Sequence, residues 1–291
     1  MSAHIVLGLS SCSNNKSKPD ASGTFETTET IISSEAIGVI KQFDITEGQT
    51  LKTGQFIGFI DTVQLYLKKK QLLAQIKTTL GQKPNIAKQL ASLETQLKAA
   101  EKEQARISNL LKSDAATQKQ MDDVNTQVET IKKQIDAQLS SLGIQSENIG
   151  QQTKPLQVQI EQLNDQLAKC KIINPVNGTV LTKYAEANEV TAPGKSLYKI
   201  ADLSTLVLKA YVTGNQFSTI KLNQKITVLV DSLDGEYKAY EGIIEWISDK
   251  AEFTPKTIQT KDERANLVYA VKIRVKNDGL LKIGMYADVK F

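Results

Sequence analysis

The chain has 291 residues, a net charge of +4 and an aromatic content of only 5 %. This length predicts two or three modules, and so few aromatic residues argue against one large globular core. The lysines are spread among acids and glutamines without a basic block, so nucleic acid is not an expected partner. The only histidine is His4 and the only cysteines are Cys12 and Cys170, which argues against a catalytic triad, a Cys-His dyad or a typical zinc site. We therefore predict a protein that is not an enzyme and needs no cofactor or metal.

Residues 1–23 have the features of a secretory leader followed by a polar tether. A short apolar run, Ile5–Leu9, precedes the tetrapeptide LSSC that ends at Cys12. This tetrapeptide resembles the lipobox of bacterial lipoproteins, which implies cleavage before Cys12 and lipid attachment to it. The leader lacks Lys or Arg before the apolar run, which leaves open a translation start upstream of Met1. A disordered N-terminus with an incidental cysteine is the alternative. No later run of 18 or more apolar residues follows, so we expect an anchored protein and not a spanning one.

Two segments far apart in the chain share one pattern. Residues 24–33 predict a strand that joins a C-terminal barrel, and residues 34–61 contain short strand-like runs separated by glycines. Residues 171–202 repeat this second pattern 140 positions later, and the matched pairs are Gly38 with Gly178, Gly48 with Asn188, Gly54 with Gly194, and Ile60 with Ile200. Asparagine is a sensible replacement because it also tolerates the left-handed region. Leu51 corresponds to Val190, one position earlier than the shared offset. We read 34–61 and 171–202 as two halves of one β-sandwich.

Residues 62–170, between the two halves, predict a long antiparallel coiled coil. Apolar residues alternate at spacings of four and three on both sides of a polar tip near residues 113–117, as heptads do. The ascending positions are Ile86, Leu90, Leu93, Leu97, Ala100, Gln104, Ile107 and Leu111, and the descending ones are Met121, Val124, Val128, Ile131, Ile135, Gln138 and Leu142. Gly81 and Pro84 on one arm, and Gly143, Gly150 and Pro155 on the other, predict breaks that face each other. About 50 residues per arm would reach roughly 75 Å.

Residues 203–291 have the character of a small β-barrel. Strand-like runs occur at 206–212, 225–230, 239–248, 267–275 and 286–291, with a short helix predicted at 215–221. Trp246 falls on a predicted strand, and we expect it in the core or at the rim of the barrel. Cys170 sits at an apolar helix position, where a buried and unreactive thiol is expected.

The two sandwich halves resemble those of a biotinyl or lipoyl carrier domain, which joins its halves by a tight hairpin bearing a modified lysine. Here the segment 62–170 replaces that hairpin, and Lys68–Lys70 begin a helix instead. A split lipoyl-like sandwich carrying a coiled-coil hairpin, followed by a barrel, resembles the HlyD-type periplasmic adaptors, also called membrane fusion proteins. The resemblance covers nearly the whole chain, from about residue 24 to 291, and implies an α+β multidomain fold.

Two C-terminal segments resemble the ABC-transporter-associated branch of that family. They are Phe253-Thr254-Pro255, followed by Gln259-Thr260 and Arg264, and the closing run Gly284–Asp288. Phe253, Pro255 and Arg264 mark a candidate transporter-facing loop, and a loop that only caps the barrel is the alternative. The sequence ends after the barrel, without the domain that adaptors of resistance-nodulation-division pumps append, which favours the ABC branch.

The tip carries the candidate docking site. Hairpins of this family that dock onto TolC-like outer-membrane channels carry an Arg-Leu-Ser constellation, and Arg106, Leu110 and Thr117 match its spacing with Thr in place of Ser. A guanidinium can bind carbonyls or carboxylates of a partner helix, and a leucine can supply an apolar anchor. Leu111 holds the heptad position, so Leu110 should face away from the seam. The alternative is that Arg106 is solvated and Leu110 belongs to the seam.

The resemblance implies a lipid-anchored periplasmic adaptor, attached to the inner membrane of a Gram-negative bacterium. It would link an inner-membrane ABC transporter to a TolC-like channel and self-associate into a ring of three or six copies. Three alternatives remain: an adaptor of a proton-driven resistance-nodulation-division pump, a biotin- or lipoate-carrying enzyme subunit, and a coiled-coil envelope scaffold or activator. No GxxxxGK[ST] phosphate loop is present, so the chain would not itself supply energy.

Overall fold

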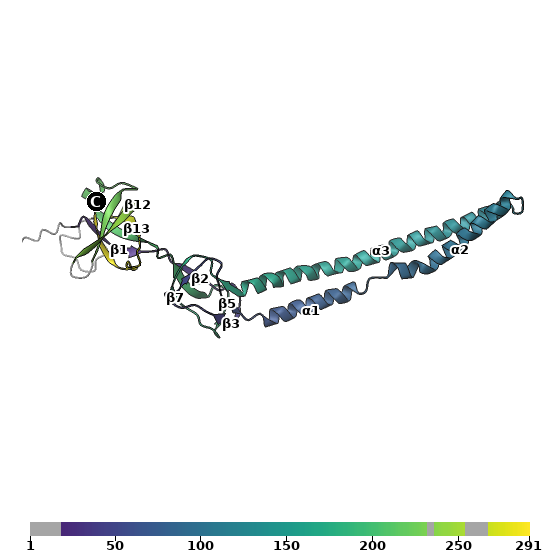
Figure 1. The fold of residues 1–291 in the computed structure, drawn as a ribbon, viewed down its shortest axis with the longest axis horizontal. Helices are drawn as coiled ribbons and strands as arrows, with labels where there is room; N and C mark the ends of the chain where they lie inside the picture. Colours follow the sequence, from purple (N-terminus) through teal and green to yellow (C-terminus); the bar gives the residue numbers. More distant parts are fainter. Residues whose placement is uncertain (1–18, 232–235, 254–266) are drawn as a thin grey trace, which may run out of the picture.

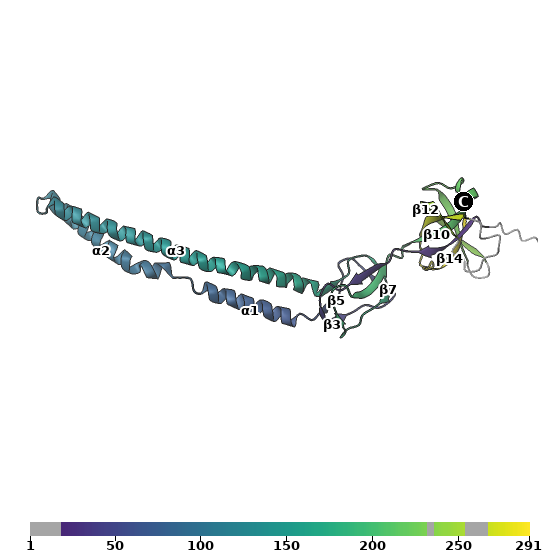
Figure 2. The same cartoon turned by 180° about the vertical axis from the view of Figure 1, so that it is seen from behind.

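The computed structural model describes residues 19–231, 236–253 and 267–291. Figure 1 shows a rod with a β-barrel at one end, a β-sandwich beside it, and a long helical hairpin that extends away from both. The chain enters the sandwich before the hairpin and returns through it afterwards, as Figure 2 shows from behind. The predicted α+β multidomain fold, with its split sandwich, coiled-coil hairpin and barrel, is confirmed.

The hairpin consists of two helices on its ascending arm and one on its descending arm. Helices α1 (Val63–Leu80) and α2 (Ile86–Lys112) both lie along α3 (Gln118–Lys169). The heptad positions form the seam, in which the buried residues are Leu72, Leu90, Ala100, Ile107, Val128, Ile131, Leu142, Ile149, Thr153 and Leu163. Gln104 also faces the seam, where its Nε2 donates to Asn125 Oδ1 at 2.7 Å, whereas Gln138 is exposed.

The predicted break in the descending arm is wrong, because α3 runs without interruption through Gly143, Gly150 and Pro155. Glycine and proline cost a helix about 1 and 3 kcal/mol. Gly143 and Pro155 occupy exposed positions, so the seam residues Leu142 and Ile149 stay in heptad register past them. The burial of the seam residues along α3 offsets the free-energy cost of Gly143 and Pro155. The predicted break on the ascending arm is correct: α1 ends before Gly81, and α2 begins where the Asn85 side chain accepts from the Lys88 amide at 3.1 Å.

The sandwich is made of two four-stranded sheets, and each sheet takes strands from both halves of the chain. One sheet has the order β2 (Thr30–Ser33), β9 (Ser196–Ala201), β7 (Gly178–Lys183), β4 (Thr50–Leu51). The other has the order β6 (Lys171–Ile173), β5 (Phe56–Ile60), β3 (Gly38–Phe43), β8 (Val190–Thr191). The two sheets correspond strand for strand at the predicted offset of 140, so the sandwich has an internal pseudo-twofold symmetry.

The matched turn residues adopt matched backbone conformations. Gly48 has φ of 83° and Asn188 has φ of 74°, both left-handed. The amide of Gly48 donates to Val180 O at 2.8 Å, and the amide of Asn188 donates to Ile40 O at 2.7 Å. The correspondence of Leu51 with Val190 is wrong, because Leu51 pairs with Gly178 as Thr191 pairs with Gly38. Thr191 is therefore the buried equivalent of Leu51.

The barrel is closed and six-stranded. Its strands follow the order β1 (Ala21–Glu26), β10 (Thr205–Thr213), β13 (Leu267–Lys276), β12 (Tyr237–Phe253), β11 (Lys225–Asp231) and β14 (Tyr286–Lys290). Gly23 allows β1 to close the barrel, because a Cβ there would collide with the carbonyl of Lys209. The helix α4 (Gly214–Phe217) is shorter than the predicted one. Trp246 lies on the barrel wall at a bulge in β12 and is partly exposed.

The assignment of residues 24–33 to the barrel needs a correction. The barrel strand is β1, which starts at Ala21, whereas β2 pairs with β9 in the sandwich. Residues between β1 and β2 cross from one domain to the other beside the returning chain, where Thr27 Oγ1 donates to Asp202 O at 3.3 Å. Alternating apolar residues identify a strand but not the sheet that it joins, which explains the error.

A buried polar pair ties the two sandwich halves together. The Tyr198 hydroxyl donates to Asn174 Oδ1 at 2.9 Å, and Asn174 Nδ2 donates to the carbonyl of Lys52 in the first half at 2.9 Å. Both side chains are fully buried, and burial raises the pKa of Tyr198 to about 12. Each polar atom named here has a partner, which removes the penalty that burial would otherwise carry.

We predict that Tyr198→Phe lowers the free energy of unfolding by about 1–3 kcal/mol at neutral pH, because Asn174 Oδ1 loses its donor. The folded pKa near 12 exceeds the ordinary value of about 10. The native protein should therefore lose stability as pH rises from about 10 to 12, and the variant should lack that part of the loss. Urea unfolding at pH 7, 9 and 11 measures both effects.

The matched control is Tyr184→Phe, at an exposed tyrosine of the same sandwich, which should change the stability by less than about 0.5 kcal/mol. Equal stabilities for Tyr198→Phe and Tyr184→Phe would contradict the structural importance of the buried bond.

Candidate docking site at the hairpin tip

The tip is a five-residue connection that is held by hydrogen bonds of its own. The amides of Ser113 and Ala115 both donate to Leu110 O, at 3.1 and 2.8 Å, and close the end of α2. Asp114 takes the left-handed conformation with φ of 55°, which turns the chain back. Short polar residues accept this conformation more readily than bulky ones. The tip is therefore a small and locally determined structure.

Thr117 forms the N-cap of α3. Its Oγ1 accepts from the Gln120 amide at 3.3 Å, and Gln120 Oε1 accepts from the Thr117 amide at 2.8 Å, which is a reciprocal capping box. Such caps contribute about 1 kcal/mol to a helix. The structure thus places the hydroxyl of Thr117 in the tip itself, and the residue remains exposed.

Arg106 lies less than two turns before the end of α2, with 63 % of its side chain exposed. Its Nε donates to Glu103 Oε2 at 2.8 Å, and a second guanidinium nitrogen binds the other carboxylate oxygen of Glu103. This hydrogen bonding lowers the pKa of Glu103 and raises that of Arg106. Leu110 and Leu111 are both half-buried, so Leu110 is less exposed than its place outside the heptad suggests. The Glu103 partner was not evident from the sequence, although its spacing of three allows the pair.

The other predicted site residues fall in three groups. Cys12, Pro255 and Arg264 lie outside the described residues, and Phe253 is the last residue of β12, paired with Leu267. Cys170 is buried at the base of the hairpin, where burial raises the pKa of its thiol, as an unreactive cysteine requires. Within the described ranges, no three His, Cys, Asp or Glu residues form a metal-binding group, and no helix is long and apolar enough to cross a bilayer.

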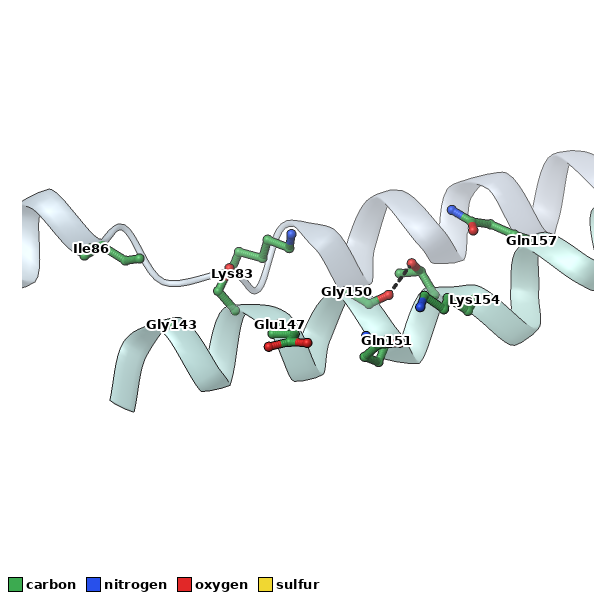
Figure 3. A pocket seen from close by; sticks show the side chains of 10 residues that line it. Lys83, Ile86, Gly143, Glu147, Gly150, Gln151, Lys154 and Gln157 are labelled. Carbon is green, nitrogen blue, oxygen red and sulfur yellow. Dashed lines mark hydrogen bonds between the residues drawn. The ribbon is translucent and has the colours of Figure 1, made fainter. Parts of the chain in front are cut away.

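An open groove, which the sequence did not predict, lies where the ascending arm is interrupted. Figure 3 shows Lys83 of the α1–α2 connection beside α3, and its Nζ lies near Gly150. Thr153 Oγ1 donates to Gly150 O at 2.7 Å within α3. The groove is open to solvent, and most of the side chains that line it are polar or charged. Its sequence signal was the coincidence of Pro84 with Gly143 and Gly150.

Comparison with known sequences gives a partial match. The UPF0194 membrane protein YbhG of Salmonella gallinarum is 35 % identical over 121 residues, and YbhG of Salmonella arizonae matches equally. These residues cover 41 % of this chain and 36 % of the Salmonella protein, so the match spans little more than a third of either. No protein-family profile matches the chain.

Comparison with solved structures covers nearly the whole chain. MacA from Actinobacillus actinomycetemcomitans aligns over 92 % of this chain and 76 % of its own, with a TM-score of 0.54 and 18 % identity. The periplasmic adaptor protein EmrA aligns over 93 % of this chain and 97 % of its own, with a TM-score of 0.52 and 14 % identity. At such low identity these similarities concern the fold. The chain therefore shares its fold with MacA and with the periplasmic adaptor protein EmrA.

Proposed function

We propose that this chain is the periplasmic adaptor subunit of a tripartite efflux or secretion system, which links an inner-membrane ABC transporter to a TolC-like outer-membrane channel. The length of the helical hairpin is the observation that supports this proposal. Helix α3 has 52 residues, which corresponds to roughly 78 Å of reach from the sandwich to the tip. A compact binding protein or enzyme has no use for such a length, whereas a spacer between two membranes does.

The proposed mechanism is geometric. The barrel end engages the transporter, the sandwiches pack side by side in a ring, and the tips meet the periplasmic helices of the channel. Energy comes from the transporter. The sandwich cannot act as a lipoyl or biotinyl carrier in the usual way, because α1 begins directly after β5 where the lysine-bearing turn would be.

Arg106 is suited to reversible docking because its present partner is easily replaced. The Arg106–Glu103 pair is exposed and joins residues of one helix, and such pairs contribute at most about 1 kcal/mol. A carboxylate or a set of carbonyls on a channel helix could therefore exchange with Glu103 at little net cost. Leu110 would add apolar contact, and the Thr117 cap would hold the tip in one shape.

The proposed anchor at Cys12 agrees with the position of the barrel. The strand β1 begins at Ala21, nine residues after Cys12, and even a fully extended tether would span only about 30 Å. A lipid on Cys12 would thus keep the barrel close to the inner membrane and point the hairpin away from it.

For the tip, we predict that Arg106→Asp abolishes crosslinking to the channel and reduces export at least tenfold in cells. In the variant, the new carboxylate would lie beside that of Glu103, which the Arg106 guanidinium now binds, and it would repel acceptor groups on a channel helix. The matched control is Lys133→Asp, which breaks the exposed Lys133–Glu129 pair on α3, about 24 Å from Thr117, and should export normally. Normal export by the Arg106→Asp variant would contradict the proposed role of Arg106 in docking.

For the anchor, Cys12→Ser should give a periplasmic form without acyl mass, released from membranes by a salt wash. Intact mass and membrane fractionation of the full-length chain measure this. A native protein that carries no acyl group and fractionates like the variant would rule out lipidation.

For the partner class, affinity purification after crosslinking in cells should recover an ABC-type permease or ATPase together with a TolC-like channel. Recovery of a proton-driven pump would favour the resistance-nodulation-division alternative, and recovery of cell-wall enzymes alone would favour the scaffold. Either result would overturn the ABC assignment.

A further inference from the structure

The end of the barrel that faces away from the sandwich is crossed by a single connection. The strand β1 starts at Ala21 and runs toward the sandwich, so its first residue lies at the far end of the rod in Figure 1. The strand β10 leaves the sandwich and pairs antiparallel with β1, so its last residue, Thr213, lies at the same far end. The next residues, 214–224, lead from β10 to β11 across this end, and we call them the lid.

The lid closes the barrel with one apolar side chain and exposes two others. Ile220 is buried in the hydrophobic cluster of the barrel, and the amide of Asn223 donates to Ile244 O at 2.8 Å as the chain returns to the wall. Phe217 is 40 % exposed and Leu222 is 59 % exposed. Because Ile220 already fills this end of the core, the fold does not require an apolar residue at position 222.

The barrel wall beside the lid adds a third exposed apolar side chain. Thr213 pairs with Val268, and the residue before Val268, Leu267, is half exposed. The ring of Phe217 lies 4.9 Å from the ring of Tyr269 on the same strand. Single exposed apolar residues are ordinary, whereas a group of them at one end of a domain indicates a contact surface.

The charge of the lid indicates which kind of surface would fit. Its only charged residue is Lys221, which is exposed. On the adjacent wall, Glu252 lies opposite Val268, and its carboxylate is 3.7 Å from Lys209 Nζ. In a lipid headgroup region, apolar side chains reach the boundary with the acyl chains while a lysine extends to the phosphates. The lid therefore has the composition of a surface that contacts phospholipid.

The N-terminal tether leaves the barrel directly beside the lid. The amide of Asp20 donates to Val289 O at 3.0 Å, and Gln216 of the lid donates through Nε2 to the carbonyl of Asp20. Cys12 precedes Asp20 by eight residues, which span at most about 28 Å when fully extended. A lipid on Cys12 would hold the lid at the membrane surface, where even a weak contact forms because its effective concentration is high.

We propose that the lid and Leu267 form a membrane-contact surface, in which Phe217 and Leu222 enter the headgroup region of the bilayer that holds the Cys12 lipid and Lys221 binds lipid phosphates. The insertion is shallow, because the other exposed side chains of the lid are polar, namely Asn215, Ser218, Thr219 and Asn223. It rests on the lipid anchor of the proposed function. The tether alone allows the barrel to swivel, whereas a second contact fixes the direction in which the hairpin points.

The test places an environment-sensitive fluorophore on the lid. The acylated full-length chain with Leu222→Cys is labelled with a nitrobenzoxadiazole maleimide, since Cys12 carries the lipid and Cys170 is buried. On vesicles of phosphatidylethanolamine and phosphatidylglycerol, the fluorescence should rise at least twofold, and doxyl-labelled phospholipid should quench it. The matched control is Leu280→Cys, which is 61 % exposed in the connection between β13 and β14 at the sandwich end of the barrel and should show neither effect. Equal signals at both positions, or no quenching at position 222, would overturn the proposal.

A second chain separates the lid from the anchor. The Cys12→Ser chain, labelled at the same two positions and mixed with excess vesicles, should again show quenching at position 222 and none at position 280. If the native chain carries no acyl group, this result would count against the anchor alone. An acylated chain whose probe at position 222 stays in water would count against the lid alone. Shielding of that probe only in the presence of a transporter, without quenching by doxyl lipid, would assign the surface to the transporter and overturn the lipid contact.

Discussion

The exchange of strands between the two halves of the sandwich is the constraint on which the rest of the structure depends. Each sheet combines strands that lie far apart in the sequence, so neither sheet is complete until 34–61 meets 171–202. Their closure brings Ile60 and Cys170 together and thereby joins the two ends of the 109-residue insertion. A segment held at both ends must leave and return, so its heptads pair antiparallel in a register that is set at the base.

Within that frame, the hairpin shows how tertiary burial and local preference compete. Gly81 and Pro84 end a helix on the ascending arm, whereas Gly143 and Pro155 do not end α3. The difference follows from the placement of the breakers, because those of α3 lie on its outer face while the buried register continues beneath them. One continuous helix opposite two shorter ones gives a rod that is supported along its length, with an open groove at the interruption.

The tip of the hairpin lies far from the hydrophobic cores of the sandwich and the barrel. The barrel and the sandwich have separate hydrophobic clusters and are joined by two short crossing segments, and the tip depends on its own caps. Changes at the tip therefore need not disturb the sandwich, and an exposed ion pair such as Arg106–Glu103 can exchange partners without loss of fold. This independence suits a protein whose proposed role is to connect other proteins.

The sequence by itself determined the elements whose signals are local. Gly48 and Asn188 marked matched left-handed turns, the alternation of three and four marked the seam, and the barrel strands followed from period-two patterns. It also pointed to Arg106, Leu110 and Thr117, but their pairing with Glu103 and Gln120 became visible only in the structure. Only the tertiary structure decided that Thr30–Ser33 belongs to the sandwich and that α3 is unbroken. It also decided that Thr191, and not Val190, occupies the position in the second half that Leu51 occupies in the first. The physical reason is the same in each case: the choice depends on burial against a partner segment far away in the chain.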